Sequence, residues 1–193
     1  MEVSEITYFF SLTTVTILFF ASLQITNSLV VPLQQWLHLD ASFAAILFLP
    51  HGVRVVSVYV LGPISAFFHL LFAVVFLEII LNFQYAADPR LYLGVVLGAA
   101  AAPAAYILTK FFVGTKYLTL ENVNYRTWRI ILLVCFLSAV INSLGQSILV
   151  YIFENQANSV TLVLKYMIGD FAGAITILLL LMFLFRKLER KVQ

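Results

Sequence analysis

The sequence predicts an all-α integral membrane protein, a bundle of about six transmembrane helices with the N-terminus and the C-terminus both cytoplasmic. Three observations predict it. Hydrophobic residues make up 63% of the 193 positions and charged residues 10%, whereas soluble domains are nearer half apolar and a quarter charged. Apolar stretches of membrane-crossing length recur along the chain, and basic residues collect in the segments that would share one side. Such a composition suits lipid as the solvent.

Six apolar stretches can be separated, and each is close to the ~20 residues that are needed to cross ~30 Å of hydrocarbon. The first and fifth are longer, which indicates either tilted helices or helices that start in the interface. The length suits one polytopic membrane domain over residues 1–193, without a second soluble domain. The predicted spans cover residues 6–31, 42–61, 63–83, 91–113, 128–153 and 161–185.

The breaks between these stretches carry turn-forming or polar residues. Gly62-Pro63 separates the second span from the third, and Asp88-Pro89-Arg90 precedes the fourth. Polar connections over residues 114–127 and 154–159 flank the fifth span. Because Gly and Pro interrupt regular helices, these positions are typical of connections at the membrane surface.

The basic residues set the orientation. With the N-terminus in the cytoplasm, only Arg90 of the 11 lysines and arginines lies on the far side, while Arg54 and Lys165 fall within spans. An excess of basic residues marks cytoplasmic segments. Because this excess places the C-terminus on the same side as the N-terminus, the number of spans must be even. The remaining eight lie on the cytoplasmic side: Lys110, Lys116, Arg126, Arg129, Arg186, Lys187, Arg190 and Lys191.

Small residues predict close helix packing in the fourth span. Gly94 and Gly98 form a GxxxG pattern that a run of alanines follows. Such a pattern lets two helix backbones approach closely. We favour packing inside the bundle, with a homodimer face as the alternative.

Ionisable residues within the spans need a reason, because each costs at least ~2.5 kcal/mol at the bilayer centre. Counted from the ends of their spans at ~1.5 Å per residue, His51, Arg54, Asn142 and Asp170 share a layer near the midplane. His51 and Arg54 lie three apart, and Asn142 and Gln146 lie four apart, so each pair shares a helix face. The simplest arrangement pairs Arg54 with Asp170, since arginine stays charged.

Two interruptions lie at this depth. Pro50-His51-Gly52 predicts a kink or break in the second span, and Gly169-Asp170-Phe171-Ala172-Gly173 predicts another in the sixth. Irregular backbone in a membrane lines either protein or a cavity. The polar layer is therefore a structural ion pair that fixes helix register, or a pocket for a small ligand that opens to the outer side. Its predicted members are Pro50, His51, Gly52, Arg54, Asn142, Gln146 and Asp170, with His69, Glu78, Lys165 and Gly173 as secondary candidates.

Several classes of function lack their motifs. His38, His51 and His69 lie at different depths without metal-ligand spacing, and no nucleophile-base set or phosphate-binding glycine loop is present. Cys135 lies in an apolar run and is expected to serve packing. The net charge of +2 is too small to indicate nucleic acid. We therefore expect neither an enzyme nor a metal, cofactor or nucleic-acid site.

Two segments resemble a known family. Residues 44–54, Ala-Ala-Ile-Leu-Phe-Leu-Pro-His-Gly-Val-Arg, with Gly62 after them, are similar to an early signature of the bacterial membrane-associated sensor domains found ahead of diguanylate cyclases and histidine kinases. Residues 169–174, Gly-Asp-Phe-Ala-Gly-Ala, resemble the Gly-Asp-x-x-Gly element near the end of that family. The resemblance implies a multi-pass module of the bacterial inner membrane that senses or binds something, and no reaction.

The sequence thus favours a sensor-type or ligand-binding module that acts through a partner protein. The alternatives are a small-solute transport component of the substrate-binding type and a structural or assembly subunit of a membrane complex. The expected partners are the lipid bilayer, a small-molecule ligand, and another membrane or cytoplasmic protein, such as a kinase, a cyclase or an energising subunit.

Overall fold

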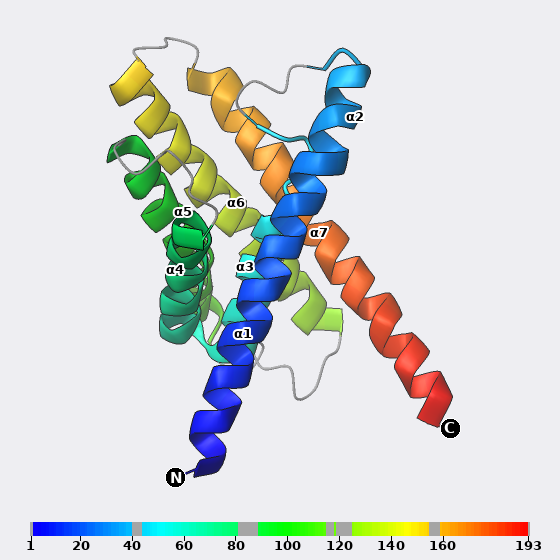
Figure 1. The fold of residues 1–193 in the computed structure, drawn as a ribbon. Helices are drawn as coiled ribbons and strands as arrows, with labels where there is room; N and C mark the ends of the chain where they lie inside the picture. Colours follow the sequence, from blue (N-terminus) through cyan, green and yellow to red (C-terminus); the bar gives the residue numbers. More distant parts are fainter. Residues whose placement is uncertain are drawn as a thin grey trace.

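The computed structural model is all-α and describes residues 2–39, 44–80, 89–114, 118, 125–154 and 159–192 (Figure 1). Within these ranges the chain forms six helices, of which the first is a continuous rod with a short π-helical turn in it. The helices are α1 (Glu2–Ile25), the π-turn η1 (Thr26–Val30) and α2 (Val31–Trp36), which form the rod, then α3 (Leu49–Leu61), α4 (Pro63–Ile80), α5 (Pro89–Val113), α6 (Tyr125–Glu154) and α7 (Ser159–Val192).

Four of these helices are long and apolar enough to cross a membrane. They cover Ser11–Trp36, Tyr92–Val113, Arg126–Phe153 and Val160–Leu184. At ~1.5 Å per residue each exceeds the ~30 Å thickness of a hydrocarbon core. The chain is therefore a multi-pass membrane protein, as its composition predicts.

The predicted second span differs from the structure. Only its latter part is helical, because α3 has 13 residues and Ala44–Phe48 are not helical. Pro50 lies in the first turn of α3, where its missing N–H costs nothing, while its ring would clash with a helical turn before it. The predicted mid-span kink is thus the start of a half-length helix. Residues 42, 43 and 81–83, at the ends of two predicted spans, lie outside the described ranges, as do 88, most of 114–127 and 155–158 in the predicted connections.

The short helix α3 is the centre of the bundle, since it contacts every other helix of the described chain. Val55 and Val58 are completely buried in one apolar cluster, which also contains Cys135 of α6. Val53 belongs to a second cluster, with Phe19 of α1. Because lipid tails are as apolar as these side chains, close van der Waals packing rather than removal from water holds α3 between its neighbours. Cys135 serves packing, as expected.

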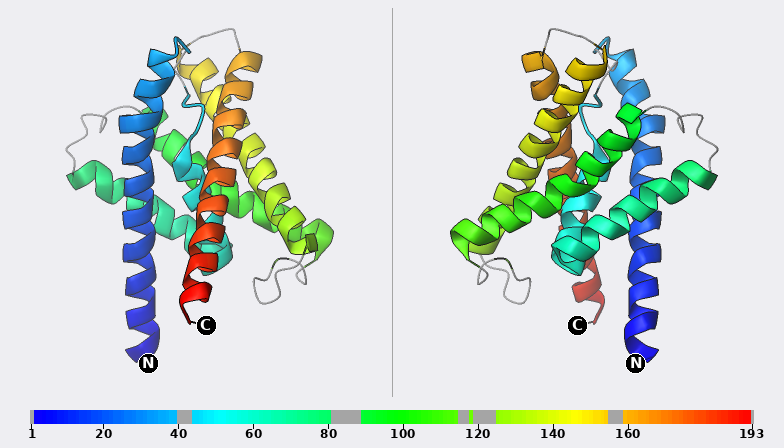
Figure 2. Two further views of the ribbon diagram at one scale, coloured as in Figure 1. Left: turned by 90° about the vertical axis from the view of Figure 1, so that its right-hand side faces the viewer. Right: turned by 90° about the vertical axis from the view of Figure 1, so that its left-hand side faces the viewer.

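The two termini lie at the same end of the bundle, and the last turn of α6 and the first turn of α7 lie at the other (Figures 1 and 2). The half-length α3 runs from the middle of the bundle towards the end with the termini, and α4 leaves from there at an oblique angle (Figure 2). Gly62 makes the turn between them with φ of 80°, a conformation that glycine adopts without strain. This arrangement agrees with the even number of crossings that the basic residues predict.

Candidate functional site: a polar pocket within the bundle

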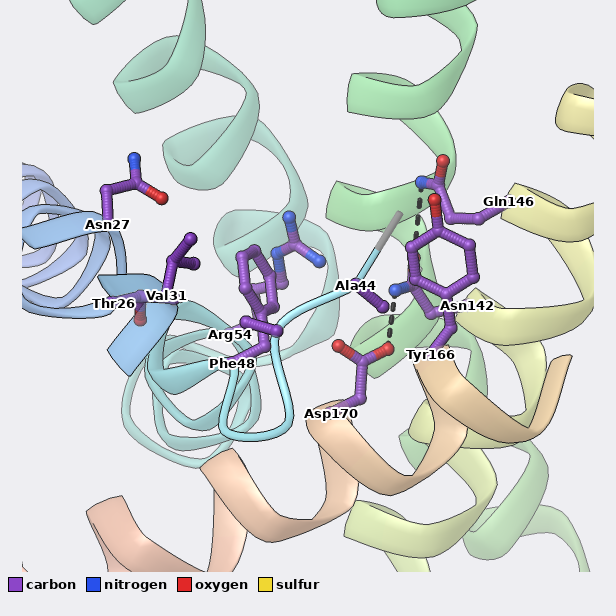
Figure 3. A pocket seen from close by; sticks show the side chains of 11 residues that line it. Thr26, Asn27, Val31, Ala44, Phe48, Arg54, Asn142, Gln146, Tyr166 and Asp170 are labelled. Carbon is purple, nitrogen blue, oxygen red and sulfur yellow. Dashed lines mark hydrogen bonds between the residues drawn. The ribbon is translucent and has the colours of Figure 1, made fainter. Parts of the chain in front are cut away.

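A cavity of about 360 Å³ is present at the start of α3. The segments of the rod, α6 and α7 that line it belong to the half of the bundle away from the termini (Figure 2). Its walls come from the rod, from the non-helical segment Ala44–Phe48, and from α3, α6 and α7, so it is built where the second span loses its helix (Figure 3). The residues that line it are Thr26, Asn27, Val31, Ala44, Ala45, Phe48, Arg54, Asn142, Gln146, Tyr166 and Asp170.

Side chains and carbonyls from the rod and from α7 hold the non-helical segment. The buried Gln34 donates from Nε2 to the Ala44 carbonyl over 3.2 Å, and its Oε1 accepts from the Ile46 N–H at 2.9 Å. The Phe48 N–H donates to the Gly169 carbonyl at 2.9 Å. Because an unpaired backbone group in a membrane costs several kcal/mol, these bonds allow irregular backbone at this depth.

Glycines of α7 let this segment lie directly on the helix. A Cβ atom at Gly169 would collide with the carbonyl oxygen of Ala45, and one at Gly173 with that of Phe48. A Cβ atom at Gly52 would lie 2.6 Å from Cβ of Ile177. The Gly-Asp-x-x-Gly pattern therefore has a steric cause: its glycines accept the backbone of the broken span, while its aspartate, between them, lines the pocket.

The rod widens beside the pocket. Residues Thr26–Val30 form a π-helical turn, in which the Val31 N–H donates to the Thr26 carbonyl five residues before it. Pro32 follows, and a proline ring clashes with the carbonyl four residues earlier unless the turn opens. The Thr26 hydroxyl donates to the Ser22 carbonyl at 2.9 Å and accepts from the Leu49 N–H at 3.3 Å. The widened turn thus caps the start of α3.

Asp170 is held by a chain of amides. Nδ2 of Asn142 donates to its Oδ2 over 2.6 Å, and the Gln146 amide donates to Oδ1 of Asn142 at a weaker 3.5 Å. Nε2 of Gln146 also donates to the Gly94 carbonyl at 2.9 Å. A bond to a charged group is shorter and stronger than one between neutral groups. The amides therefore orient one carboxylate oxygen towards α6, while the other points away from Asn142 (Figure 3).

Arg54 enters the same cavity from α3. Its side chain is only 8% exposed, and its guanidinium carbon lies 5.7 Å and 5.5 Å from the ring centres of Phe19 and Phe48. Gly98 makes room for it, because a Cβ atom there would lie 2.8 Å from Nη2. The faces of aromatic rings attract a cation. The buried Nε, however, has no hydrogen-bond partner.

The predicted ion pair between Arg54 and Asp170 does not form. In the part of the chain that the structure describes, the ionic contact of Asp170 is with Nδ1 of His51 at 3.7 Å, which is beyond hydrogen-bond distance. Both ring nitrogens of the fully buried His51 lack a hydrogen-bond partner. The reason is that aromatic rings and Gly98 hold the guanidinium, whereas the carboxylate is turned to Asn142. Two opposite charges therefore face one cavity separately.

The other predicted site residues fall into two groups, those that the structure brings together and those that lie apart. His51, Arg54, Asn142 and Asp170, predicted to share one layer, do come together. The predicted residues Pro50, His51 and Gly52 are buried but do not line the pocket. His69 lies elsewhere: its Nδ1 is 2.8 Å from the Ser65 carbonyl, beside a separate open hollow of about 490 Å³ at the α3–α4 turn. Lys165 is half-buried on α7 outside the pocket lining, and the side chain of Glu78 is not among those described.

The GxxxG pair of α5 also faces inwards. Gly94 accepts a hydrogen bond from Gln146 of α6, and Gly98 lies against the guanidinium of Arg54 on α3. Both glycines therefore accommodate polar side chains of the candidate site. This is the internal packing role that the sequence favours over a homodimer face.

Sequence reasoning missed several residues of the site. Thr26, Gln34, Phe48 and Tyr166 either line the pocket or hold the broken segment. Gln34 gave a signal, since it is an uncharged polar residue in an apolar run two positions after Pro32. No feature of the sequence marked Tyr166 as a site residue, because an aromatic residue near the end of a span is equally typical of an interfacial anchor.

A second cavity of about 560 Å³ lies between α1, α3 and α7, in the half of the bundle that contains the termini. Its walls are apolar apart from four serine and threonine residues, and Ser22 and Ser57 already bond to the backbone of their own helices. Of these two cavities the polar one is the candidate site, because two charged side chains and several uncharged polar ones converge on it. The described residues include no group of three or more His, Cys, Asp or Glu side chains that could hold a metal ion.

No protein-family model, curated protein or solved structure matches this chain. The class is therefore defined by the fold itself. It is a multi-pass α-helical membrane protein whose central half-helix begins at a polar pocket.

Proposed function

We propose that this protein is a ligand-binding module of the bacterial inner membrane that takes a small polar molecule into the pocket between Arg54 and Asp170. The observation that carries the proposal is the state of Arg54. Its side chain is buried and lines the cavity, yet its Nε lacks a hydrogen-bond partner. A buried cation whose hydrogen-bonding capacity is not fully used is costly, and a ligand in the cavity that Arg54 lines would supply an acceptor to its guanidinium.

A purely structural polar layer would be expected to look different. If these charges served only helix register, direct pairing would lower their burial cost, as in ordinary buried ion pairs. Here the glycine at position 98, the π-turn and the non-helical segment all keep space open around separated charges. Each of these features costs stability, which supports a binding role over a packing role.

The module would act through a partner protein. The resemblance of residues 44–54 and 169–174 to membrane-associated sensor domains supports a signalling partner, such as a kinase or cyclase. A transport role as the substrate-binding component, with an energising subunit, is the second candidate. The half-length helix supports it, because broken helices at mid-membrane depth are common at transporter sites.

The test is purification in mild detergent, followed by mass spectrometry of the small molecules and the proteins that accompany the chain. We expect a small polar molecule in the wild-type sample and its loss from the Arg54→Gln variant. Arg129→Gln is the matched control, because Arg129 is exposed on α6. A co-purifying kinase or cyclase supports sensing, and an ATPase supports transport.

Loss of thermal stability in Arg54→Gln without any bound molecule in the wild-type sample would overturn the binding role. The polar layer would then serve packing, and the chain would be a structural subunit of a membrane complex. Isothermal titration with any molecule identified in the wild-type sample gives an independent measurement on the same preparation.

A further inference from the structure

We infer that the ligand of this pocket is a small zwitterion that carries a carboxylate and an ammonium group, as an amino acid does. The inference rests on the proposed function and names its ligand class. Two groups carry it: the guanidinium of Arg54 and the carboxylate of Asp170, which line one cavity without pairing with each other.

The Arg54 side fits a carboxylate. The guanidinium of Arg54 is flanked by the rings of Phe19 and Phe48 and by Gly98, none of which offers a side-chain acceptor. Among the described residues it forms no ion pair, and its Nε is buried without a hydrogen-bond partner. A planar guanidinium binds a carboxylate through two parallel hydrogen bonds. The ligand would therefore place its carboxylate here.

The Asp170 side fits an ammonium group. Oδ2 of Asp170 accepts from Asn142 at 2.6 Å, while its other oxygen points away from that amide (Figure 3). The nearby Nδ1 of His51 is 3.7 Å from Oδ2 and makes no hydrogen bond. An ammonium donates up to three hydrogen bonds, and the free carboxylate oxygen and the Oδ1 atom of Asn142 are acceptors on this wall.

Charge balance selects a zwitterion over an ion of one sign. Arg54 and Asp170 give the pocket no net formal charge, so a simple anion would satisfy Arg54 and leave Asp170 as an uncompensated buried charge. A simple cation would do the reverse. Burying a lone charge is far more costly than burying a matched pair, and only a ligand with both charges satisfies both walls.

The size and the remaining walls limit the rest of the molecule. About 360 Å³ lies at the lower end of the ~300–1,000 Å³ that ligand pockets span. The rings of Phe48 and Tyr166 and the side chain of Val31 contribute apolar surface to the remaining walls, and Thr26, Asn27 and Gln146 contribute uncharged polar groups. The pocket therefore suits a single small zwitterion with an apolar or polar side group, and not a peptide or a lipid.

The experiment compares amino acids with analogues that lack one charge, using the full chain in lipid nanodiscs and isothermal titration. The amino acids are L-alanine, L-leucine and L-phenylalanine. Propionate, 4-methylpentanoate and 3-phenylpropanoate lack the ammonium group, and ethylamine, 3-methylbutylamine and 2-phenylethylamine lack the carboxylate. We expect at least one amino acid to bind at least tenfold more tightly than both of its analogues, because each analogue leaves one wall unpaired.

Two variants link the selectivity to the walls. Arg54→Gln should lower amino-acid affinity at least tenfold and remove the difference between the amino acid and its amine. Asp170→Asn should remove the difference between the amino acid and its carboxylate analogue. Arg54→Lys keeps the charge and provides a second test should Arg54→Gln fail to elute as a folded particle.

The outcomes separate this inference from the binding role. A carboxylate that binds as tightly as its amino acid overturns the zwitterion but leaves a ligand-binding pocket. The same conclusion follows if none of the nine probes binds and the co-purified molecule lacks the carboxylate, the ammonium group or both. Failure of every probe, together with the absence of any co-purified molecule, overturns both.

Discussion

The carbonyl oxygen of Phe48 occupies the space where a Cβ atom on residue 173 would stand, so Gly173 is what allows the broken span to lie on α7. The contact is between two backbones, and neither can move aside as a flexible side chain would. The Phe48 N–H is tied to the Gly169 carbonyl one turn earlier on the same helix. These contacts place the aromatic ring of Phe48 beside Arg54 and set the wall of the pocket.

Gly173→Ala should therefore destabilise the protein and displace the segment Ala44–Phe48. Forcing one extra methyl group into a packed site costs typically about 1–3 kcal/mol, although alanine favours a helix over glycine by ~1 kcal/mol. We expect a lower thermal midpoint in detergent, together with faster hydrogen exchange across residues 44–48.

Gly145→Ala is the matched control, since it is also a helical glycine. There a Cβ atom would lie 3.1 Å from the end of the Leu97 side chain, which can adjust. Its stability should be unchanged or higher because of the better helix propensity. Equal effects of the two substitutions would contradict the steric role of Gly173.

Gln34→Met should loosen the broken segment without removing apolar packing. The substitution leaves the Ile46 N–H and the Ala44 carbonyl without the partners that Gln34 now supplies. An unsatisfied buried backbone group costs about 1–3 kcal/mol. We expect this loss in SDS titration of the folded protein, with weaker ligand binding as a consequence. Gln35→Met is the control, because its neighbour Gln35 is exposed. A loss of the same size in both variants would show that the segment does not depend on Gln34.

Asn142 and Asp170 should be energetically coupled, because their hydrogen bond is short, buried and charge-assisted. In a double-mutant cycle of Asn142→Ala and Asp170→Ala, we expect a coupling free energy of roughly 1.5–3 kcal/mol. Without ligand, the cycle of Arg54→Leu and Asp170→Leu should give a smaller value, since these two side chains form no ion pair. A larger value for the second cycle would show that the two charges pair directly in solution.

The sequence was informative about the elements and the depth of the polar residues, but not about their partners. Apolar length and the basic residues predict the long helices and the shared side of the termini, because lipid imposes these features on any membrane chain. Helical rise places Arg54 and Asp170 in one layer. The helical rise does not predict which way a long arginine side chain turns. In the structure, the rings of Phe19 and Phe48 determine the direction of the Arg54 side chain.

The short length of α3 was also not predictable from the sequence. Residues 42–61 are mostly apolar, although they include His51 and Arg54, so composition alone predicts a full span, and Pro50 indicates either a kink or a helix start. What decides between these outcomes lies elsewhere in the chain. Gln34, Thr26 and Gly169 supply the hydrogen bonds that make a non-helical segment tolerable inside the bundle.

The orientation of the bundle can be tested at the two ends of α7. Val160 is 74% exposed in the first turn of α7, and Lys187 is exposed towards the C-terminal end of the same helix. Because basic residues cluster at the end with the termini, that end should face the cytoplasm. In a Cys135→Ser background, which removes the buried native thiol, each position can be replaced by cysteine.

We expect a membrane-impermeant maleimide to label Val160→Cys in intact cells and to label Lys187→Cys only after the membrane is opened. A fluorescent reporter fused after Gln193 should also be active in the cytoplasm. The opposite labelling pattern would invert the protein and would place the half of the bundle that contains the polar pocket towards the cytoplasm. Since the pocket lies in the half away from the termini, the expected pattern assigns it to the outer half of the membrane, where it would meet a ligand from outside the cell.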